Sequence, residues 1–499
     1  MPTTPDIVIG LDIGTTSTMG VAVRLPDQIL AVAKRPVTLS SPNPGWAEED
    51  PGEWWQNSVE ILREITTRID PKSLAGICLT GMLPAVVLLD AAGDLLRPSI
   101  QQSDGRCVAE VDSLRRDYDE AAFLARTGNG INQQLVAAKL RWIATNEPQV
   151  HNKIATVFGS YDYINWCLTG VRAVEQNWAL EAGFTDLATH AIADDLVALG
   201  GIPRTAVPQR TVSHQQMGRV SAEAAALTGL PEGLPVFGGA ADHIVSAFAA
   251  GVSRSGDVLL KFGGAGDIIV ASDRALPDRR LFLDYHLIPG LYAPNGCMAS
   301  SGTALNWLTG VLQLPPGTNS PHQALDAEAA AIAPGANGLI CLPYFLGEKT
   351  PIHDPLARGA FVGLTLTHTP AHIWRATLEA VAFGFRHHID VLRDMGHTPT
   401  RYLASDGGTA SQVWMQIMAD VLGKPLQLLE NAYGSSVGAA FIAAIGAGLT
   451  DDWGAVSKLS RYGVEIQPSV ERHAAYDRAY LDYRQLYQTL APYFHRSTG

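Results

Sequence analysis

Val8 to Val23 reads Val-Ile-Gly-Leu-Asp-Ile-Gly-Thr-Thr-Ser-Thr-Met-Gly-Val-Ala-Val, and this stretch decides the fold that the sequence predicts. Two apolar, β-prone runs flank a short polar turn, which predicts a strand, a tight turn and a second strand. Gly10 and Gly14 allow another body to approach the backbone closely. Hydroxyl donors beside the turn amides come from Thr15, Thr16 and Ser17. The turn is therefore a candidate phosphate cradle.

Asp12 lies in the first expected strand, just before this turn. Its carboxylate is placed to hold a divalent metal against a nucleotide phosphate, directly or through water. An ordinary hairpin with one buried, hydrogen-bonded aspartate explains the same residues equally well. A second copy of the pattern favours the phosphate site, because Lys261 to Val270 reads Lys-Phe-Gly-Gly-Ala-Gly-Asp-Ile-Ile-Val. Two such hairpins predict duplicated domains that face each other across one nucleotide.

With these hairpins the chain resembles the sugar kinases of the FGGY family, within the larger actin, hexokinase and heat-shock-chaperone group of folds. The resemblance covers Ile9 to about Leu449 and is nearest to the xylulokinase-like members. It implies an α/β fold of two ribonuclease-H-like domains around a catalytic cleft. We place a sugar-binding domain at residues 1–250 and an ATP-binding domain with a C-terminal helix at residues 251–499. No Gly-x-x-x-x-Gly-Lys-Ser/Thr motif occurs, which argues against a P-loop enzyme.

Length and composition agree with a globular protein of two domains and argue against a nucleic-acid-binding protein. The 499 residues are too many for one core, and 46% hydrophobic with 17% charged residues is typical of a globular protein. The net charge of −13 argues against nucleic acid as a partner. ATP is still a reasonable ligand, because backbone amides and a metal neutralise phosphate locally.

The cysteines and the apolar runs predict a cytoplasmic protein with no membrane segment. Five scattered cysteines without a Cys-x-x-Cys pair indicate thiols in a reducing compartment. The first residues show no basic segment followed by an apolar one, so we expect no secretory signal. The longest apolar run, Val437 to Leu449, is shorter than the ~18 to 20 residues that a membrane helix needs.

Two segments of the first half resemble the family's sugar-binding loops. Asp104 and Arg106 match the pattern in Pro-Ser-Ile-Gln-Gln-Ser-Asp-Gly-Arg, so the resemblance implies that they contact the sugar. A local ion pair explains the two residues as well. Three positions depart from the pattern: Leu83 stands for Met, Pro84 for His and Gln102 for Trp. Because a site that binds hydroxyls discriminates by the donors it presents, these changes suggest an altered sugar preference.

Asp242 is the candidate catalytic base. It follows Gly-Gly-Ala-Ala and opens an Ala-rich helix, where a simple N-cap is the alternative role. The resemblance implies that Asp242 binds the sugar and accepts the proton of the attacking hydroxyl. The neighbouring His243 is expected to be structural.

The nucleotide site of the second half is predicted from three glycine turns. Relatives often have Gly-Thr-Ser-Gly where this chain has Gly263-Gly264-Ala265-Gly266, so two hydroxyl donors are missing, although backbone amides still bind phosphate. Gly407, Gly408 and Ser411 resemble the family's turn against adenosine at a helix N-terminus. Gly434 to Ala440 begins another helix near the expected base. Helix capping alone is the alternative for both segments.

The resemblance implies an ATP-dependent sugar kinase with ATP and Mg²⁺ as cofactors. The leading prediction is phosphorylation of a ketopentose such as D-xylulose to xylulose 5-phosphate. A kinase for another pentulose, a tetrulose, a ketohexose or a polyol is the alternative within this class. A non-catalytic ATP-dependent sugar sensor is the alternative from a different class. A homodimer stays open, and the stripe of Tyr476, Tyr480, Tyr483 and Tyr487 predicts a last helix docked on the body.

Overall fold

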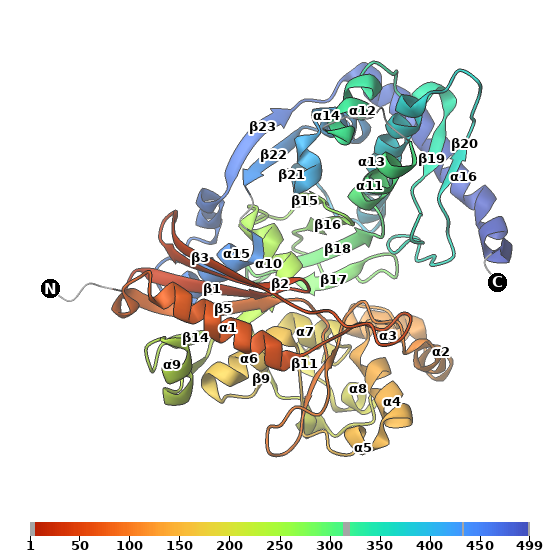
Figure 1. Cartoon of the computed structure of the whole chain (residues 1–499). Coiled ribbons are helices and arrows are strands. Elements are labelled where there is room, and N and C mark those ends of the chain that lie inside the picture. The colour runs from red at the N-terminus through yellow and green to blue at the C-terminus, as the bar shows by residue number, and fades with distance from the viewer. Residues whose placement is uncertain (1–4, 313–319, 432–433, 498–499) are drawn as a thin grey trace.

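The computed structural model describes residues 5–312, 320–431 and 434–497 and contains two large mixed sheets, each covered by helices (Figure 1). The first sheet has the order β13-β14-β5-β1-β2-β3. Its strands are β1 (Ile7–Ile13), β2 (Ser17–Arg24), β3 (Gln28–Pro36), β5 (Leu74–Gly81), β13 (Gln216–Arg219) and β14 (Pro235–Ala241). The opening hairpin is confirmed, since β1 and β2 pair antiparallel with Ile13 opposite Thr18.

The second sheet has the order β17-β18-β16-β15-β21-β22-β23. Its strands are β15 (Asp257–Phe262), β16 (Gly266–Val270), β17 (Phe282–Tyr285), β18 (Tyr292–Met298), β21 (Arg401–Ser405), β22 (Leu426–Asn431) and β23 (Arg461–Ile466). The repeated hairpin is confirmed, since β15 and β16 pair antiparallel.

The two sheets repeat one pattern of strands. In β3-β2-β1-β5-β14 the first two pairings are antiparallel and the last two are parallel. The series β18-β16-β15-β21-β22 has the same order and the same directions. The predicted fold class, two duplicated α/β domains of ribonuclease-H-like type, is therefore confirmed. The boundary at residue 250 stays a prediction.

Helices α10 (Asp242–Ala249) and α15 (Gly434–Gly446) lie between the two sheets (Figure 1). Helix α15 comes late in the chain but packs on β1 and β5 of the first sheet. A Cβ atom on Gly10 would lie 1.8 Å from the carbonyl oxygen of Ser436 and 2.5 Å from the amide of Ala440. The body that Gly10 lets approach is thus this helix. Its apolar face joins the first core, which also takes in Leu259 of the second sheet.

The outer helices and short strands complete both domains. In the first half the helices are α1 (Pro51–Thr66), α2 (Val108–Asp117), α3 (Glu120–Thr127), α4 (Val136–Asn146), α5 (Pro148–His151), α6 (Ser160–Thr169), α7 (Gln176–Glu181), α8 (Asp194–Ala198) and α9 (Ala222–Thr228). In the second half they are α11 (Gly302–Val311), α12 (Pro321–Ala329), α13 (Pro370–Asp394), α14 (Gln412–Leu422) and α16 (Val470–Ser497). Short pairings join β4 (Glu48–Glu49) with β7 (Ser99–Ile100), β6 (Val87–Leu89) with β8 (Thr156–Phe158), β9 (Ala173–Glu175) with β12 (Gln209–Thr211), β10 (Thr185–Asp186) with β11 (Ala191–Ile192), and β19 (Ile340–Leu342) with β20 (Ala360–Val362).

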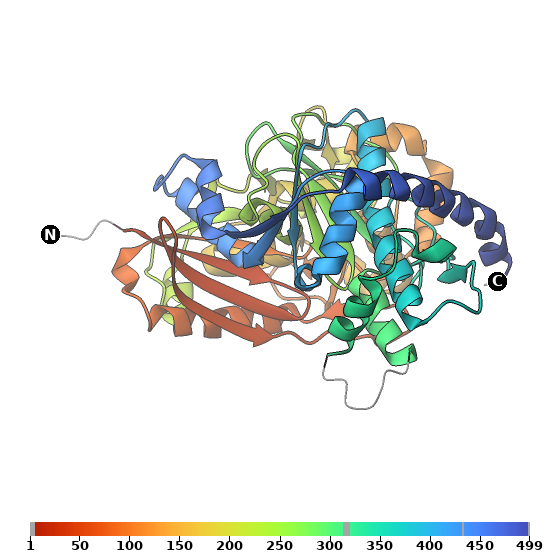
Figure 2. The same cartoon turned by 90° about the horizontal axis from the view of Figure 1, so that it is seen from above.

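The predicted docking of the last helix is confirmed. Helix α16 runs along the second domain (Figure 2), where Tyr476, Tyr480 and Tyr483 are buried in the second core. The hydroxyls of Tyr483 and Tyr344 are 2.8 Å apart, and the Tyr487 hydroxyl donates to Asp354. All five cysteines are free thiols. Among the helices of the described ranges, none has both the length and the apolar character needed to cross a membrane.

Candidate functional site

A cavity of about 380 Å³ lies between the two domains. Both domains contribute to its wall: Thr15, Met82, Leu83, Gln102, Gln134, Glu181, Asp242, His243, Ser246, Lys261, Asp267, Ile269, Phe282, Asn295, Gly296, Cys297, Lys349 and Ser435. Of the sequence-predicted site residues, the cavity therefore brings together Thr15, Leu83 and Asp242. The charged groups around Asp242 determine what this arrangement does chemically.

Asp242 is the first residue of α10, directly after β14. The N-cap residue of α10 is Ala241, and no side chain caps this end of the helix. Asp242 therefore does not have the simple N-cap role that was the alternative to a catalytic one. Its carboxylate accepts a hydrogen bond of 2.6 Å from the amide of His243. Burial alone would raise the pKa of Asp242, but the hydrogen bond and positive charge of His243 outweigh it and lower the pKa. An ionised carboxylate in the cavity is a competent proton acceptor.

His243 is held between two carboxylates. Its Nε2 lies 3.0 Å from Oδ2 of the buried Asp284, and its Nδ1 lies 3.5 Å from Oδ1 of Asp242. Burial opposes the charged ring, yet these two carboxylates raise the pKa of His243 well above its ordinary value. The ligand atoms of Glu181, His243 and Asp284 lie within 4.8 Å of one another, close enough to share a cation. The imidazolium already supplies positive charge there.

Asp284 lies on β17, and two asparagines of the first domain pair with the backbone of this strand. The side-chain amide of Asn129 exchanges two hydrogen bonds of 2.9 Å with Leu283. Asn177 does the same with Tyr285, at 2.7 and 3.0 Å. Both asparagines are buried. The two side chains thus replace a neighbouring strand and fix Asp284 opposite His243.

Asp12 is the residue best suited to hold a divalent metal. Its Oδ2 accepts a 2.6 Å hydrogen bond from the Ser435 hydroxyl at the start of α15. Its Oδ1 is buried and has no hydrogen-bond partner among the described residues. Burial and the nearby charge of Asp242 raise the pKa of Asp12 to about 7. A magnesium ion fits this carboxylate, because it would satisfy the orphan oxygen and favour the ionised form.

The first hairpin turn presents one of its predicted residues to the cavity. Thr15 is in the wall, whereas Thr16 is exposed. The Gly14 amide donates to the Ser17 carbonyl across the turn, at 3.2 Å. The second hairpin turn lies outside the wall and packs on the start of α11, since the Gly263 carbonyl accepts from the Gly302 amide at 2.9 Å. Gly264 accepts from Ser301 and Thr303 in the same way.

The predicted adenosine turn also lies outside this cavity. Gly408 packs so closely on β15 that a Cβ atom would lie 2.6 Å from Cβ of Phe262. Ser411 caps α14, where its hydroxyl accepts from the Trp414 amide at 3.1 Å. A Cβ atom on Gly407 would meet no atom within 4 Å. Contact of Gly407, Gly408 and Ser411 with adenosine stays a prediction.

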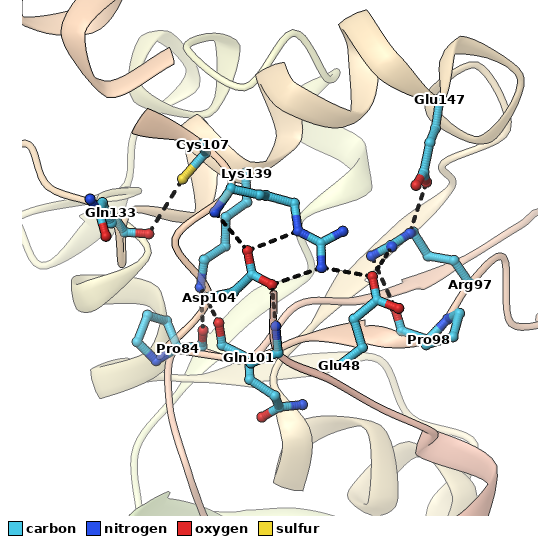
Figure 3. Close-up of polar contacts among 12 residues, drawn as sticks. Glu48, Pro84, Arg97, Pro98, Gln101, Asp104, Cys107, Gln133, Lys139 and Glu147 are labelled. Carbon is cyan, nitrogen blue, oxygen red and sulfur yellow. Dashed lines mark hydrogen bonds and ion pairs between the residues drawn. The ribbon is translucent and has the colours of Figure 1, made fainter. Parts of the chain in front are cut away.

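Asp104 and Arg106 form a buried ion network and are not part of the cavity wall. Figure 3 shows Asp104 and Glu48 in this network. Arg106 donates to both oxygens of Asp104, at 2.8 and 2.7 Å, and to Glu48 at 2.7 Å. Its guanidinium lies over the rings of Trp46 and Trp142, 3.8 and 4.9 Å from their centroids. The described geometry thus favours the ion-pair alternative, and sugar contact by these two residues stays a prediction.

Buried Lys139 joins the two segments that carry the three altered positions. The buried ammonium of Lys139 donates to the carbonyls of Gln101 and Pro84, at 2.8 and 3.4 Å (Figure 3). Leu83 and Gln102, which flank these contacts in sequence, line the cavity. The side-chain amide of Gln134 donates to Gln102 at 3.4 Å. Of the altered positions, Leu83 and Gln102 therefore face the space where a substrate would bind.

Several residues that line the cavity could not be predicted as site residues from the sequence. Lys261 lies inside the quoted second hairpin, but a single lysine in a strand is a common feature. Lys349 lies in the Gly-Glu-Lys-Thr-Pro loop at residues 347–351, which belongs to none of the segments discussed above. Asn295 comes from a strand without a recognisable motif. Only the fold brings these side chains together.

Comparison with known proteins identifies relatives along nearly the whole chain. Residues 7–249 match the N-terminal domain of the FGGY family of carbohydrate kinases, and residues 269–447 match its C-terminal domain. The xylulose kinase of Escherichia coli K12 is 28% identical over 492 residues, covering 97% of this chain and 99% of that protein. The crystal structure of xylulose kinase from Rhodospirillum rubrum is 62% identical, with a TM-score of 0.94 over 98% of this chain and 100% of that one.

Proposed function

This chain belongs to the FGGY family of carbohydrate kinases, and from that premise we propose that it transfers the γ-phosphoryl group of ATP to D-xylulose, forming xylulose 5-phosphate. One observation carries the proposal: a single cavity between the domains holds the ionised Asp242, Thr15 of the first hairpin and residues of the second hairpin. The 62% identity to a xylulose kinase supports D-xylulose as the acceptor.

Asp242 orients the attacking hydroxyl of the sugar and accepts its proton. The hydroxyl oxygen forms a bond to the γ-phosphorus, and the bond from that phosphorus to the bridging oxygen breaks, so its electron pair leaves with ADP. Because phosphoryl transfer has a loose transition state, positioning and charge neutralisation contribute more than the base alone. His243 and Asp284 hold the base ionised and in place.

The nucleotide binds with its phosphates toward the two hairpins. Asp12 would hold the magnesium ion, which when bound neutralises phosphate charge. Thr15 and the amides of the first turn contact the phosphates. Gly263 and Gly264 contact the phosphates from the second turn. Gly407, Gly408 and Ser411 lie against the adenosine. Closure of the domains over both substrates would exclude water and limit ATP hydrolysis.

The sugar wall gives a reason to test other ketoses beside D-xylulose. Leu83 presents no hydrogen-bonding group, and Gln102 offers an amide beside Gln134. A site that lacks a partner for one hydroxyl discriminates against the sugar that needs it. Because of these two wall residues, another pentulose is the second candidate substrate.

The cytoplasmic location and the homodimer remain expectations from the sequence.

The test is sugar-dependent ADP release with MgATP across ketopentoses, ketohexoses, tetruloses and polyols. We expect the largest kcat/KM with D-xylulose. Asp242→Asn should lower kcat by about 10²- to 10⁴-fold while the purified variant still binds ATP and sugar. A different preferred sugar would overturn the substrate and locate the change at Leu83 and Gln102. Sugar-dependent turnover that survives in Asp242→Asn would overturn the assigned base.

A further inference from the structure

Lys261 is a cation of the cavity that none of the roles above uses. It lies on β15, two residues before the Gly263 turn. Lys261 pairs with Asp267 on β16, and Asp267 pairs with Cys297 on β18. Residues opposite each other in antiparallel strands point to the same face. All three line the cavity, so the ammonium faces the space between the domains.

The charges of four carboxylates act on this lysine, and two of them, Asp242 and Asp267, line the cavity with it. Burial disfavours the charged ammonium, but the charges of Asp267, Asp406, Asp242 and Asp12 outweigh burial and raise the pKa of Lys261. The ammonium is therefore positive at neutral pH. These carboxylates come from both domains, and Asp12 and Asp242 are the residues assigned to the metal and to the proton.

Despite these neighbours, the ammonium is not paired with any of them. Across the described ranges, Lys261 forms no hydrogen bond within 3.5 Å and no ion pair within 4.0 Å. A structural counter-ion would contact at least one carboxylate, as Arg106 does with Asp104 at 2.7 Å. An unpaired cation in a cavity lined by carboxylates is thus arranged for an incoming anion.

We propose that Lys261 binds the phosphoryl group under transfer and replaces the hydroxyl donors that are missing at Gly264 and Ala265. This inference rests on the proposed function, since that function supplies the anion. The ammonium donates hydrogen bonds to non-bridging oxygens of the γ-phosphate and transfers no proton. Its charge offsets the repulsion between the phosphate and the carboxylates of the site. A donor that strengthens its contact as charge develops in the transition state raises kcat.

Neutral and charge-conserving variants separate this role from a structural one. Lys261→Met keeps the length of the side chain and removes the charge, whereas Lys261→Arg keeps the charge. The matched control is Lys34→Met, an exposed lysine on β3. We expect Lys261→Met to lower kcat by about 10²- to 10³-fold, with thermal unfolding within the range of the control. Lys261→Arg should recover at least about tenfold of that loss, as a retained charge-assisted donor predicts.

Calorimetric binding of ATP and of ADP, each with Mg²⁺, tests the contact without any turnover. The γ-phosphate is the only difference between the two ligands, and Lys261→Met removes only the contact with it. The variant should therefore lose the preference for ATP over ADP. Its Kd for ADP should stay within about threefold of that of the parent protein. Equal losses for both nucleotides, or an unchanged preference, would overturn the inference. If Lys261→Met unfolds, Lys261→Gln is measured in its place.

The binding experiment also keeps this inference distinct from the proposed function. A parent protein that turns over none of the sugars would refute the proposed substrate class, while the nucleotide preference still reports on Lys261. Conversely, normal D-xylulose turnover by Lys261→Met would refute the role of Lys261 and leave the sugar kinase in place.

Discussion

Replacing Gly10 by alanine tests whether the contact between β1 and α15 is as close as the structure has it. The added Cβ would lie 1.8 Å from the Ser436 carbonyl oxygen, whereas real Cβ contacts are essentially never below 3.0 Å. The helix or the strand must therefore shift by about 1.2 Å, the difference between these two distances. Because both neighbours are backbone atoms, no side chain can rotate away. Overpacking of this kind costs about 1 to 3 kcal/mol, and more where the backbone resists.

Thermal unfolding followed by tryptophan fluorescence measures this cost. At roughly 2 to 4 °C per kcal/mol for a domain of this size, Gly10→Ala should lower Tm by about 2 to 12 °C. The control is Gly310→Ala, since Gly310 lies in helix α11 and a Cβ there meets no atom within 4 Å. Alanine should stabilise that exposed helix position by about 0.5 to 1 kcal/mol.

The shift should also reach the metal site. Ser435 is the second residue of the same helix and donates to Asp12 at 2.6 Å, so a displaced α15 weakens this hydrogen bond. We expect Gly10→Ala to raise the KM for MgATP while Gly310→Ala leaves it unchanged. A Gly10→Ala protein with the Tm and KM of the parent would show that the helix is not packed on β1 in this way.

Three further variants test the ion network, the metal carboxylate and the contact between domains. Arg106→Met should cost about 3 to 5 kcal/mol by leaving Asp104 charged and unpaired, with a lower Tm; a raised sugar KM at unchanged Tm would instead support direct sugar contact. The pKa of Asp12 is raised to about 7 in the folded protein. Between roughly pH 4 and 7 the folded state therefore keeps a proton on Asp12 that the unfolded state has released. The free energy of unfolding without metal thus falls as the pH rises through this window. Asp12→Asn should therefore be more stable than the parent in urea at pH 8 but not at pH 4, and equal stabilities at pH 8 would contradict the raised pKa. Asn129→Ala leaves two buried backbone groups of Leu283 unpaired, at about 1 to 3 kcal/mol each, and should speed exchange of the Leu283 amide hydrogen; exchange as slow as in the control Asn146→Ala would exclude the pairing.

The parts of this fold that could be predicted from the sequence are those with a local signal. Apolar runs interrupted by glycine turns predicted both hairpins and, through their similarity, the duplication. A role for Asp242 in the site was predicted because the residues on both sides of it form a recognisable motif; it lines the cavity, and its catalytic role stays a prediction. These signals need only neighbouring residues in the chain.

The features that escaped prediction depend on contacts between distant segments. The packing of α15 on β1 joins the end of the chain to its beginning, and no local pattern encodes it. The pairing of Asn129 with β17 uses an ordinary asparagine in a loop. Asp104 and Arg106 fit a sugar-binding pattern, yet their side chains form a buried network with Glu48, and Arg106 packs on Trp46 and Trp142.

The return of α15 to the first sheet also has a consequence for how the protein is made. The first half of the chain leaves the ribosome with one face of β1 and β5 uncovered, because the helix that covers them lies at residues 434–446. A fragment that stops at residue 250 should therefore expose apolar surface and aggregate, although it contains a complete sheet. Adding residues 251–499 as a separate chain should rescue its solubility. The two halves of the chain thus share one strand pattern, but we expect them not to fold independently.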